Sequence, residues 1–354
     1  MTMQADFAQT SSNGVPRFVQ KNRLLIACVA LQTFAAFLVS RVLGIPFELH
    51  TFHALMSVCF QLVPVTLTLL LILHFAYLAL IVRPERPIQR MIADAKSIFL
   101  DWERMATGSL ALMCFVFFIG SFTFLKSAIP QLVPFSWDVT FAEWDRALHF
   151  GVDPYKLVLG LMGTPLVATV INVAYHWWFF MMYFLLIFAC FTKINRQAAS
   201  TFLVSTVLVW FLGGNVLATV FSSAGPVYFE RMGLGTDFVA LTDALKSFNQ
   251  SGTIWALDVH EMLWKGYVAE GTINGISAMP SMHVASTVLM TLYAFSFGRW
   301  AGRAMLAFLS IILIGSVMLA WHYAIDGYFG ALIAVLVWML SKRLVALDSK
   351  SGRS

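Results

Sequence analysis

Charged residues are scarce in this chain. Asp, Glu, Lys and Arg make up 12% of its 354 residues, whereas hydrophobic residues make up 59% and the mean hydropathy is +0.79. So little polar surface excludes a soluble globular protein, and the apolar length suffices for several crossings of a bilayer. The net charge of +5 does not indicate nucleic-acid binding, because the basic residues form no basic face or tract. The composition predicts an integral membrane protein.

Cysteine is scarce too. All four cysteines fall inside apolar runs and lack the spacing of metal ligands, which argues against a disulfide framework and against a cysteine metal site. The many Met and Phe residues are typical of packing between helices and against lipid, and they indicate no cofactor. We expect no bound metal and free, buried thiols at Cys28, Cys59, Cys114 and Cys190.

Apolar runs of about 20 residues, the length that crosses roughly 30 Å of hydrocarbon as a helix, recur along the chain. They predict an all-α polytopic bundle of about eight transmembrane helices. If the amino terminus is cytoplasmic, most of the 23 Lys and Arg residues fall on the cytoplasmic side, as the positive-inside rule requires. The eight predicted spans are residues 24–43, 55–82, 108–129, 165–191, 199–221, 281–297, 304–321 and 325–340.

The segments between the spans divide the chain. We expect a disordered cytoplasmic tail over residues 1–22, amino-terminal helices over 23–164, a second helical core over 165–341 and a cytoplasmic tail over 342–354. Helical spacing of apolar residues predicts an amphipathic cytoplasmic helix at 88–103. Residues 130–163, with Asp138, Glu143, Asp145 and Asp153 among aromatics, are interpreted as an exoplasmic loop that covers or flanks a site. Residues 222–279 form a second exoplasmic loop, long enough to indicate function.

Two short polar motifs stand at the exoplasmic ends of the last spans: Pro280-Ser281-Met282-His283 and His322-Tyr323-Ala324-Ile325-Asp326. The four-residue spacing of His322 and Asp326 puts both side chains on one helical face, where the carboxylate orients the imidazole. Ser281 and His283 open a span, and the free N–H groups of that helix start favour an anion. These groups suit phosphoryl transfer through a phosphohistidine.

The two motifs resemble the second and third signatures of the type 2 phosphatidic acid phosphatase superfamily, PSGH and SRxxxxxHxxxD. The resemblance covers about a third of the chain and implies a phosphatase-like catalytic core within 165–341. It further implies that His322 is the nucleophile, that Asp326 is its partner and that His283 protonates the leaving group. We expect the neighbouring motif residues Pro280, Ser281 and Tyr323 to contact substrate.

The departures from these signatures narrow the expected activity. Met282 replaces the family glycine, Gly315 and Ser316 stand where serine and arginine are expected, and the upstream KxxxxxxRP signature is missing. A pattern without the basic anchors is similar to the branch that contains inositol phosphorylceramide synthase, which transfers a phospho-headgroup between lipids. Candidates for the missing phosphate contacts are Arg231, Lys246 and Lys265, and His176 is a candidate headgroup contact.

The sequence therefore favours a transferase that moves phosphate or a phospho-headgroup, such as phosphoinositol, from a lipid donor to a lipid or polyol acceptor. We expect it in a bacterial inner membrane with its site facing the periplasm. Three alternatives stay open: a lipid phosphate phosphatase with water as acceptor, a metalloenzyme that uses His283, His322 and Asp326 as ligands, and a non-enzymatic transporter. Other histidines at the interface, such as His149 and His260, are interpreted as snorkelling or hydrogen-bonded residues.

Overall fold

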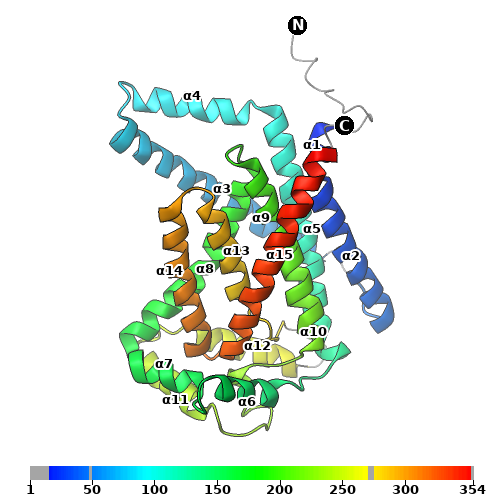
Figure 1. The fold of residues 1–354 in the computed structure, drawn as a ribbon, viewed down its shortest axis with the longest axis vertical. Coiled ribbons are helices and arrows are strands. Elements are labelled where there is room, and N and C mark those ends of the chain that lie inside the picture. Colours follow the sequence, from blue (N-terminus) through cyan, green and yellow to red (C-terminus); the bar gives the residue numbers. More distant parts are fainter. Residues whose placement is uncertain (1–15, 48–49, 270–274, 352–354) are drawn as a thin grey trace.

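The computed structural model describes the backbone of residues 16–47, 50–269 and 275–351, and the side chains of these residues except 50–62 and 351. The described chain is all-helical and has no strand, which confirms the predicted fold class. Its long helices run side by side as a bundle, and shorter helices gather at the lower end of Figure 1.

Seven of these helices are long and apolar enough to cross a membrane. An eighth expected span is α13 (Met282–Phe295), which is apolar but shorter, because its 14 residues rise only about 21 Å. The other spans are α2 (Arg23–Leu43), α3 (His50–Tyr77) with η2 (Leu78–Val82), α5 (Trp102–Leu132), α8 (Pro165–Phe191), α9 (Arg196–Phe211) with η3 (Leu212–Leu217) and α10 (Ala218–Val220), α14 (Arg299–Met318) and α15 (Ala324–Ser351).

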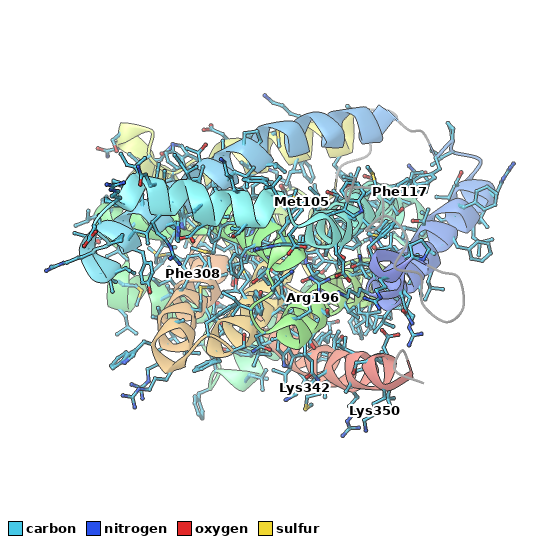
Figure 2. The ribbon with its side chains drawn as sticks, turned by 90° about the horizontal axis from the view of Figure 1, so that it is seen from above. Met105, Phe117, Arg196, Phe308, Lys342 and Lys350 are labelled. Atoms are coloured by element: carbon cyan, nitrogen blue, oxygen red, sulfur yellow. The ribbon has the colours of Figure 1, made fainter. Side chains whose placement is uncertain are left out.

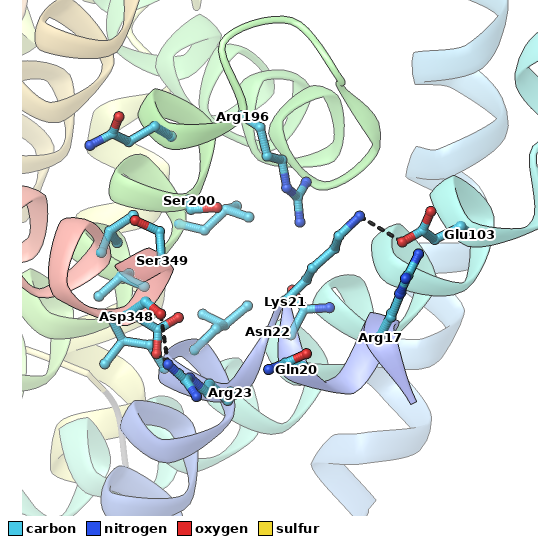
Figure 3. Close-up of a pocket in the computed structure, with 16 residues that line it drawn as sticks. Arg17, Gln20, Lys21, Asn22, Arg23, Glu103, Arg196, Ser200, Asp348 and Ser349 are labelled. Atoms are coloured by element: carbon cyan, nitrogen blue, oxygen red, sulfur yellow. Dashed lines mark hydrogen bonds and ion pairs between the residues drawn. The ribbon is translucent and has the colours of Figure 1, made fainter. Parts of the chain in front are cut away.

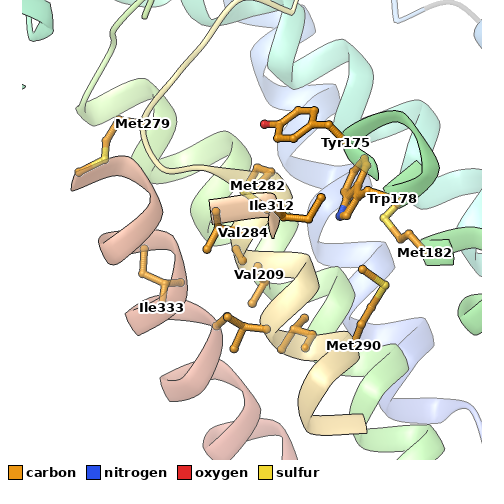
Figure 4. Packing of buried hydrophobic residues seen from close by; sticks show 14 of the residues in the cluster. Tyr175, Trp178, Met182, Val209, Met279, Met282, Val284, Met290, Ile312 and Ile333 are labelled. Carbon is orange, nitrogen blue, oxygen red and sulfur yellow. The ribbon is translucent and has the colours of Figure 1, made fainter. Parts of the chain in front are cut away.

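The short helix α13 forms the centre of the core. It packs against α8, α9, α14 and α15 and is buried along nearly its whole length. Figure 4 shows Val284 and Met290 of α13 among Trp178 of α8, Val209 of α9 and Ile333 of α15. Since α13 is covered by its neighbours, it holds the residues at its amino end in a fixed position.

Short helices close the lower end of the bundle (Figure 1). The segments 130–163 and 222–279, which the sequence suggested to be loops, contain helices, and residues 270–274 lie outside the described part. Their apolar faces are buried against one another and against the bundle, which accounts for the aromatic residues in both segments. These helices are α6 (Asp138–Leu148), α7 (Pro154–Met162), η4 (Pro226–Tyr228), α11 (Val239–Phe248), η5 (Asn249–Ser251) and α12 (Ala256–Val268).

The upper end carries ion pairs that water reaches. The predicted amphipathic helix is α4 (Pro87–Phe99), which lies across this end, and the last residues of the predicted range begin α5. Lys21 pairs with Glu103 at 2.7 Å and Arg23 pairs with Asp348, beside a cavity of about 710 Å³ (Figure 3). Viewed from this end, Arg196 lies over the middle of the bundle (Figure 2).

Both predicted tails contain helix. The helix α1 (Arg17–Gln20) precedes Asn22, whose buried amide donates to the carbonyl of Thr107 at 2.9 Å, so the expected disorder over 1–22 is wrong for its last residues. Residues 1–15 lie outside the described part. At the other terminus α15 continues to Ser351, and the predicted tail at 342–354 is therefore largely helix, with 352–354 not described.

The cysteines are free where their side chains are described. Cys114 and Cys190 are buried, as expected, whereas Cys28 is half-buried. The side chain of Cys59 lies outside the described residues.

Candidate active site

His322 lies in the turn between α14 and α15. The backbone N–H groups of Trp321 and His322 both donate to the carbonyl of Ser316, at 3.1 and 3.0 Å, and this holds the turn. The imidazole is almost fully buried, and its Nδ1 donates to Oδ2 of Asp326 at 3.3 Å. The ring also lines a cavity.

The pairing of His322 and Asp326 confirms that the two motif residues meet, although not on one helix face. His322 precedes α15, and Asp326 is in its first turn. Oδ2 of Asp326 also accepts from the backbone N–H of Tyr323 at 3.1 Å, so the same carboxylate caps the helix and orients the ring. Burial lowers the pKa of His322 to about 3, a hydrogen bond to the backbone of Ala278 acts in the opposite direction, and the charge of Lys126 lowers it further.

His283 lies in the first turn of α13, which begins after Ser281, whose hydroxyl accepts from the N–H of Val284 at 3.4 Å. The imidazole of His283 stacks on Tyr175, with ring centroids 4.3 Å apart, and on Trp178, at 4.2 Å. Its centroid is 6.2 Å from that of His322. This separation leaves room for both rings to contact one phosphoryl group.

Two acids of α6 fix the segments around His322, and the motif analysis missed them. Both carboxyl oxygens of Asp138 accept backbone N–H groups, of Ala224 at 2.9 Å and Gly225 at 2.8 Å, and Oδ1 also accepts the Tyr323 hydroxyl at 2.9 Å. Gly225 is required there, because its φ is +104° and a Cβ would lie 2.8 Å from the Trp321 carbonyl. Burial raises the pKa of Asp138, whereas its hydrogen bonds lower it.

Asp145 is the second acid, two turns further along α6. Its carboxylate accepts the N–H groups of Ala324 at 2.7 Å and Ile325 at 2.8 Å, and thereby caps α15 from a distant helix. Burial raises its pKa to about 6, the two hydrogen bonds lower it, and nearby Asp326 raises it. The seven-residue spacing of Asp138 and Asp145 was a signal that both face the same side of a helix.

A cavity of about 780 Å³ joins His283 and His322 to Lys126 of α5. The amino group of Lys126 donates to the Ser277 carbonyl at 3.4 Å, and within the described residues no carboxylate lies within ion-pair distance of it. Its charge acts on both histidines. A lone lysine inside the predicted span 108–129 was the signal for this group, because burying an ionisable side chain in a membrane is costly.

The other predicted substrate contacts separate into two groups. Pro280 and His176 line the cavity with the histidines, and the ring of His176 also packs edge-to-face on Trp255. Ser281 and Tyr323 are buried in supporting positions: Ser281 caps α13 and donates its N–H to the Asp326 carbonyl at 3.0 Å, and Tyr323 donates to Asp138.

The predicted cations lie elsewhere. Arg231 pairs with Glu261, stacks over Trp264 and lines a separate cavity of about 210 Å³ together with Lys246. Lys265 is exposed and lines neither cavity. The structure therefore brings none of these three cations to the histidines, because the helices of segment 222–279 turn them outward. Lys126 has the position that they were expected to fill.

Met282 fits where it stands because the neighbouring helix provides space. Its sulfur would be 3.4 Å from a Cβ on Gly213, and its Cγ would be 3.4 Å from a Cβ on Gly214. On Gly214 the Cβ would also meet Phe122 at 2.8 Å. The glycine pair lies in the π-helical turn η3, so this irregular turn of the fifth span admits the Met282 and Phe122 side chains.

The metalloenzyme alternative lacks a ligand cluster. Across the part of the chain that the structure describes, no three His, Cys, Asp or Glu side chains gather as metal ligands. Asp326 faces His322, and the ring of His283 stacks on aromatic neighbours instead of facing the carboxylate.

A family model described as the PAP2 superfamily matches residues 139–340, which is more than half of the chain. The chain belongs to the PAP2 superfamily. Members of the PAP2 superfamily are generally phosphatases or phosphotransferases. The matched region contains both histidine motifs but begins after Lys126, which lines the cavity, and after Asp138, which supports the segments around His322. No curated protein and no solved structure matches the chain.

Proposed function

We propose that this protein is a membrane phosphotransferase that moves phosphate or a phospho-headgroup from a lipid donor to a second acceptor through a phosphohistidine at His322. The observation that carries the proposal is the single cavity that holds His322, His283 and Lys126. It offers a nucleophile, a proton donor and a cation for the phosphate oxygens. Membership of the PAP2 superfamily supports the same class of chemistry.

The first step forms the phosphoenzyme. Because its pKa lies near 3, His322 is neutral at physiological pH, and with Nδ1–H donated to Asp326 the lone pair on Nε2 attacks the phosphorus. The bond from phosphorus to the leaving oxygen breaks. That oxygen keeps the electron pair of the bond and takes a proton from His283, which enters the step as the imidazolium and leaves it neutral. Asp326 stabilises the positive charge that develops on the His322 ring. Lys126 holds the phosphate oxygens in place of the arginines and lysine expected from the family signatures.

The second step transfers the group to the acceptor. The acceptor hydroxyl gives its proton to His283, its oxygen attacks the phosphorus, and the bond from phosphorus to His322 breaks. Water in this role would give a phosphatase. The aromatic lining of the cavity favours a lipid acceptor, and the lost basic anchors favour headgroup transfer of the kind found in the inositol phosphorylceramide synthase branch.

We also propose that this site faces the exoplasmic side, which in a bacterial inner membrane is the periplasm. The support is the distribution of charge. Arg196 and the ion pairs of Lys21 and Arg23 lie at the opposite end of the bundle, and the positive-inside rule assigns such an end to the cytoplasm.

Trapping of the phosphoenzyme tests the mechanism. The purified protein would be mixed with phospholipid donors labelled in the phosphate, quenched in alkali and assayed for alkali-stable, acid-labile label, with and without ceramide, diacylglycerol or inositol. We expect label on the wild type and on His74→Ala, a matched control at the far end of the bundle, and none on His322→Ala. Retention of full turnover by His322→Ala would show that the mechanism is wrong.

A second variant assigns the proton donor. An ester with a nitrophenol leaving group needs little protonation, so His283→Ala should form the phosphoenzyme from it at close to the wild-type rate. The same variant should resolve the phosphoenzyme slowly, since the acceptor loses its base, and label should accumulate. Equal losses with lipid and nitrophenyl donors would contradict this role for His283.

A further inference from the structure

The cavity does not end at the histidines. It continues as a groove along one face of α5, and the lining residues recur at helical spacing from Lys126 inward. Phe115 is eleven positions from Lys126 along the chain, so the groove runs about 16 Å along the helix axis. The α5 residues that line it are Phe115, Phe118, Ile119, Phe122, Thr123, Lys126 and, beside Lys126, Ser127.

Helix α8 forms the opposite wall with the same length. Its lining residues extend from Tyr175, beside His283, to Leu186, which again spans about 16 Å. Apart from the polar end at Lys126 and the histidines, aromatic and aliphatic side chains dominate both walls. Phe179 and Phe180 are exposed on the outside of α8 and Thr123 on α5, so the groove opens sideways toward the bilayer.

The far end of the groove is closed. A second cavity of only about 20 Å³ lies beyond it, and the two cavities share the side chains of Phe115, Ile119, Tyr183 and Leu186 as lining. Phe115 and Leu186 are buried and pack in the core. Removal of either side chain would join the two spaces and lengthen the groove.

We propose that this groove holds the hydrocarbon chain of the lipid whose phosphate lies between Lys126 and His322, and that Phe115 and Leu186 set the chain length. The proposal rests on the proposed function and adds the substrate class. A lipid with an anionic headgroup is complementary to this groove. Its headgroup fits the end that carries Lys126, and its hydrocarbon chain fits the long apolar part. Because α5 precedes the region matched by the PAP2 superfamily and α8 lies within it, the Phe115 wall comes from the amino-terminal helices and the Leu186 wall from the matched region.

Chain-end crosslinking tests the occupant without relying on turnover. A phosphatidic acid with a photoreactive diazirine at the end of one acyl chain would be bound to the full-length protein in lipid nanodiscs, irradiated, and the labelled peptides mapped by mass spectrometry. We expect label near Phe115 on α5 or Leu186 on α8, displaced by unlabelled lipid. Label confined to exposed side chains such as Met113 and Val170 would overturn the proposal.

Variants with shifted chain-length profiles test the length limit. Each methylene buried contributes up to roughly a fourfold gain in affinity, so kcat/KM for wild type should rise along a series of acyl chains and then level off. Phe115→Ala should move that limit to longer chains. Ile119→Trp should lower kcat/KM for long chains about tenfold or more and spare short, water-soluble donors. Met113→Trp, on the exposed side of α5, is the matched control and should follow wild type.

The outcomes separate the two proposals. If the groove variants leave the chain-length profile unchanged while His322→Ala abolishes turnover, the groove proposal is wrong and the mechanism stands. If His322→Ala keeps its turnover but the diazirine still labels the end of the groove, lipid binds there and the phosphotransfer mechanism is wrong.

Discussion

The two ends of the bundle hold cavities of similar size and opposite character. The cavity at the amino terminus, about 710 Å³, lies among ion pairs such as Lys21 with Glu103, whose side chains are about half exposed. The cavity at the histidines, about 780 Å³, is lined by aromatic rings, and its cation Lys126 has only a carbonyl as partner among the described residues. Hydrated pairs contribute little to stability, whereas a desolvated charge without a partner is costly.

This difference indicates which of the two cavities is suited to bind an anion. At the upper end, Glu103 and Asp348 compensate the charges of Lys21 and Arg23. At the lower end, buried carboxylates hold the segments around the histidines: Asp138 and Asp145 accept backbone N–H groups, and Asp326 binds His322. A lysine with no carboxylate partner among the described residues, beside two histidines, is complementary to an anion, which an incoming phosphate would provide.

The largest difference between the two ends is expected when the lysine of each cavity, Lys126 or Lys21, is replaced. Lys126→Met should lower kcat/KM for phosphotransfer by roughly 10²–10³, the loss typical of a missing contact to a developing oxyanion, and Lys126→Arg should restore part of it. Lys21→Met, the matched change in the other cavity, should stay within about twofold of wild type. Steady-state kinetics in lipid nanodiscs would measure both. Similar losses for the two methionine variants would remove the distinction drawn between the cavities.

A carboxylate at the histidine end should contribute more to the stability of the fold than one at the opposite end. Asp138→Ala orphans two buried N–H groups and the Tyr323 hydroxyl, and should destabilise the fold by about 3–5 kcal/mol. Asp348→Ala breaks a pair with Arg23 that water reaches, and should cost about 1 kcal/mol or less. Thermal unfolding in one detergent, followed by circular dichroism, gives the two shifts. Equal shifts would mean that burial does not decide the value of these carboxylates.

Local patterns in the sequence predicted most of the fold, but not how the ends are arranged. Apolar runs indicated the spans, because hydrocarbon thickness fixes their length. The predicted contact of His322 with Asp326 is present, but it forms across the turn before α15 and not on a helix face. The shortness of α13 follows from its burial among other helices, which no local pattern reveals. The helices within 130–163 were missed because aromatic side chains at an interface suit a loop equally well.

There is also a physical reason why the sequence did not predict Lys126 as part of the site. The order of the family signatures places the expected cations near residues 222–279. Lys126 reaches the histidines from α5 by tertiary packing, a long-range relation that spacing does not encode. Its one sequence signal, a charge inside an apolar run, is equally consistent with the charge asymmetry of the loops.

Acid should weaken the histidine end selectively. Burial, with a smaller contribution from the Arg231 charge, lowers the pKa of His260 to about 3, below its unfolded value of 6.5. As the pH falls below 6.5, the unfolded chain takes up the proton first, so the folded state loses up to about 1.4 kcal/mol per pH unit until about pH 3. His260 is not the hydrogen-bonded residue expected: within the described residues its ring nitrogens have no partner.

Replacement of His260 isolates its contribution to the pH dependence of stability. His260→Phe should lose roughly 2 kcal/mol less stability than wild type between pH 8 and pH 5, because phenylalanine has no proton to bind and can pack on Trp321 in the same space. Melting curves at the two pH values, for wild type and variant, measure the difference. An identical pH dependence for both proteins would mean that His260 is accessible to protons in the folded state.

The smallest effect is expected at the opposite end, where Lys21 and Glu103 pair at 2.7 Å with about half of each side chain exposed. Lys21→Gln should cost about 0.2–1 kcal/mol, since water already solvates both charges and ordering the two side chains offsets part of the attraction. A double-mutant cycle with Glu103→Gln isolates the pair, and melting at low and high salt should show the coupling shrink as ions screen it. A coupling that stays constant in high salt, or that exceeds the loss from Asp138→Ala, would mean that this end is as desolvated as the histidine cavity and that the contrast between them is wrong.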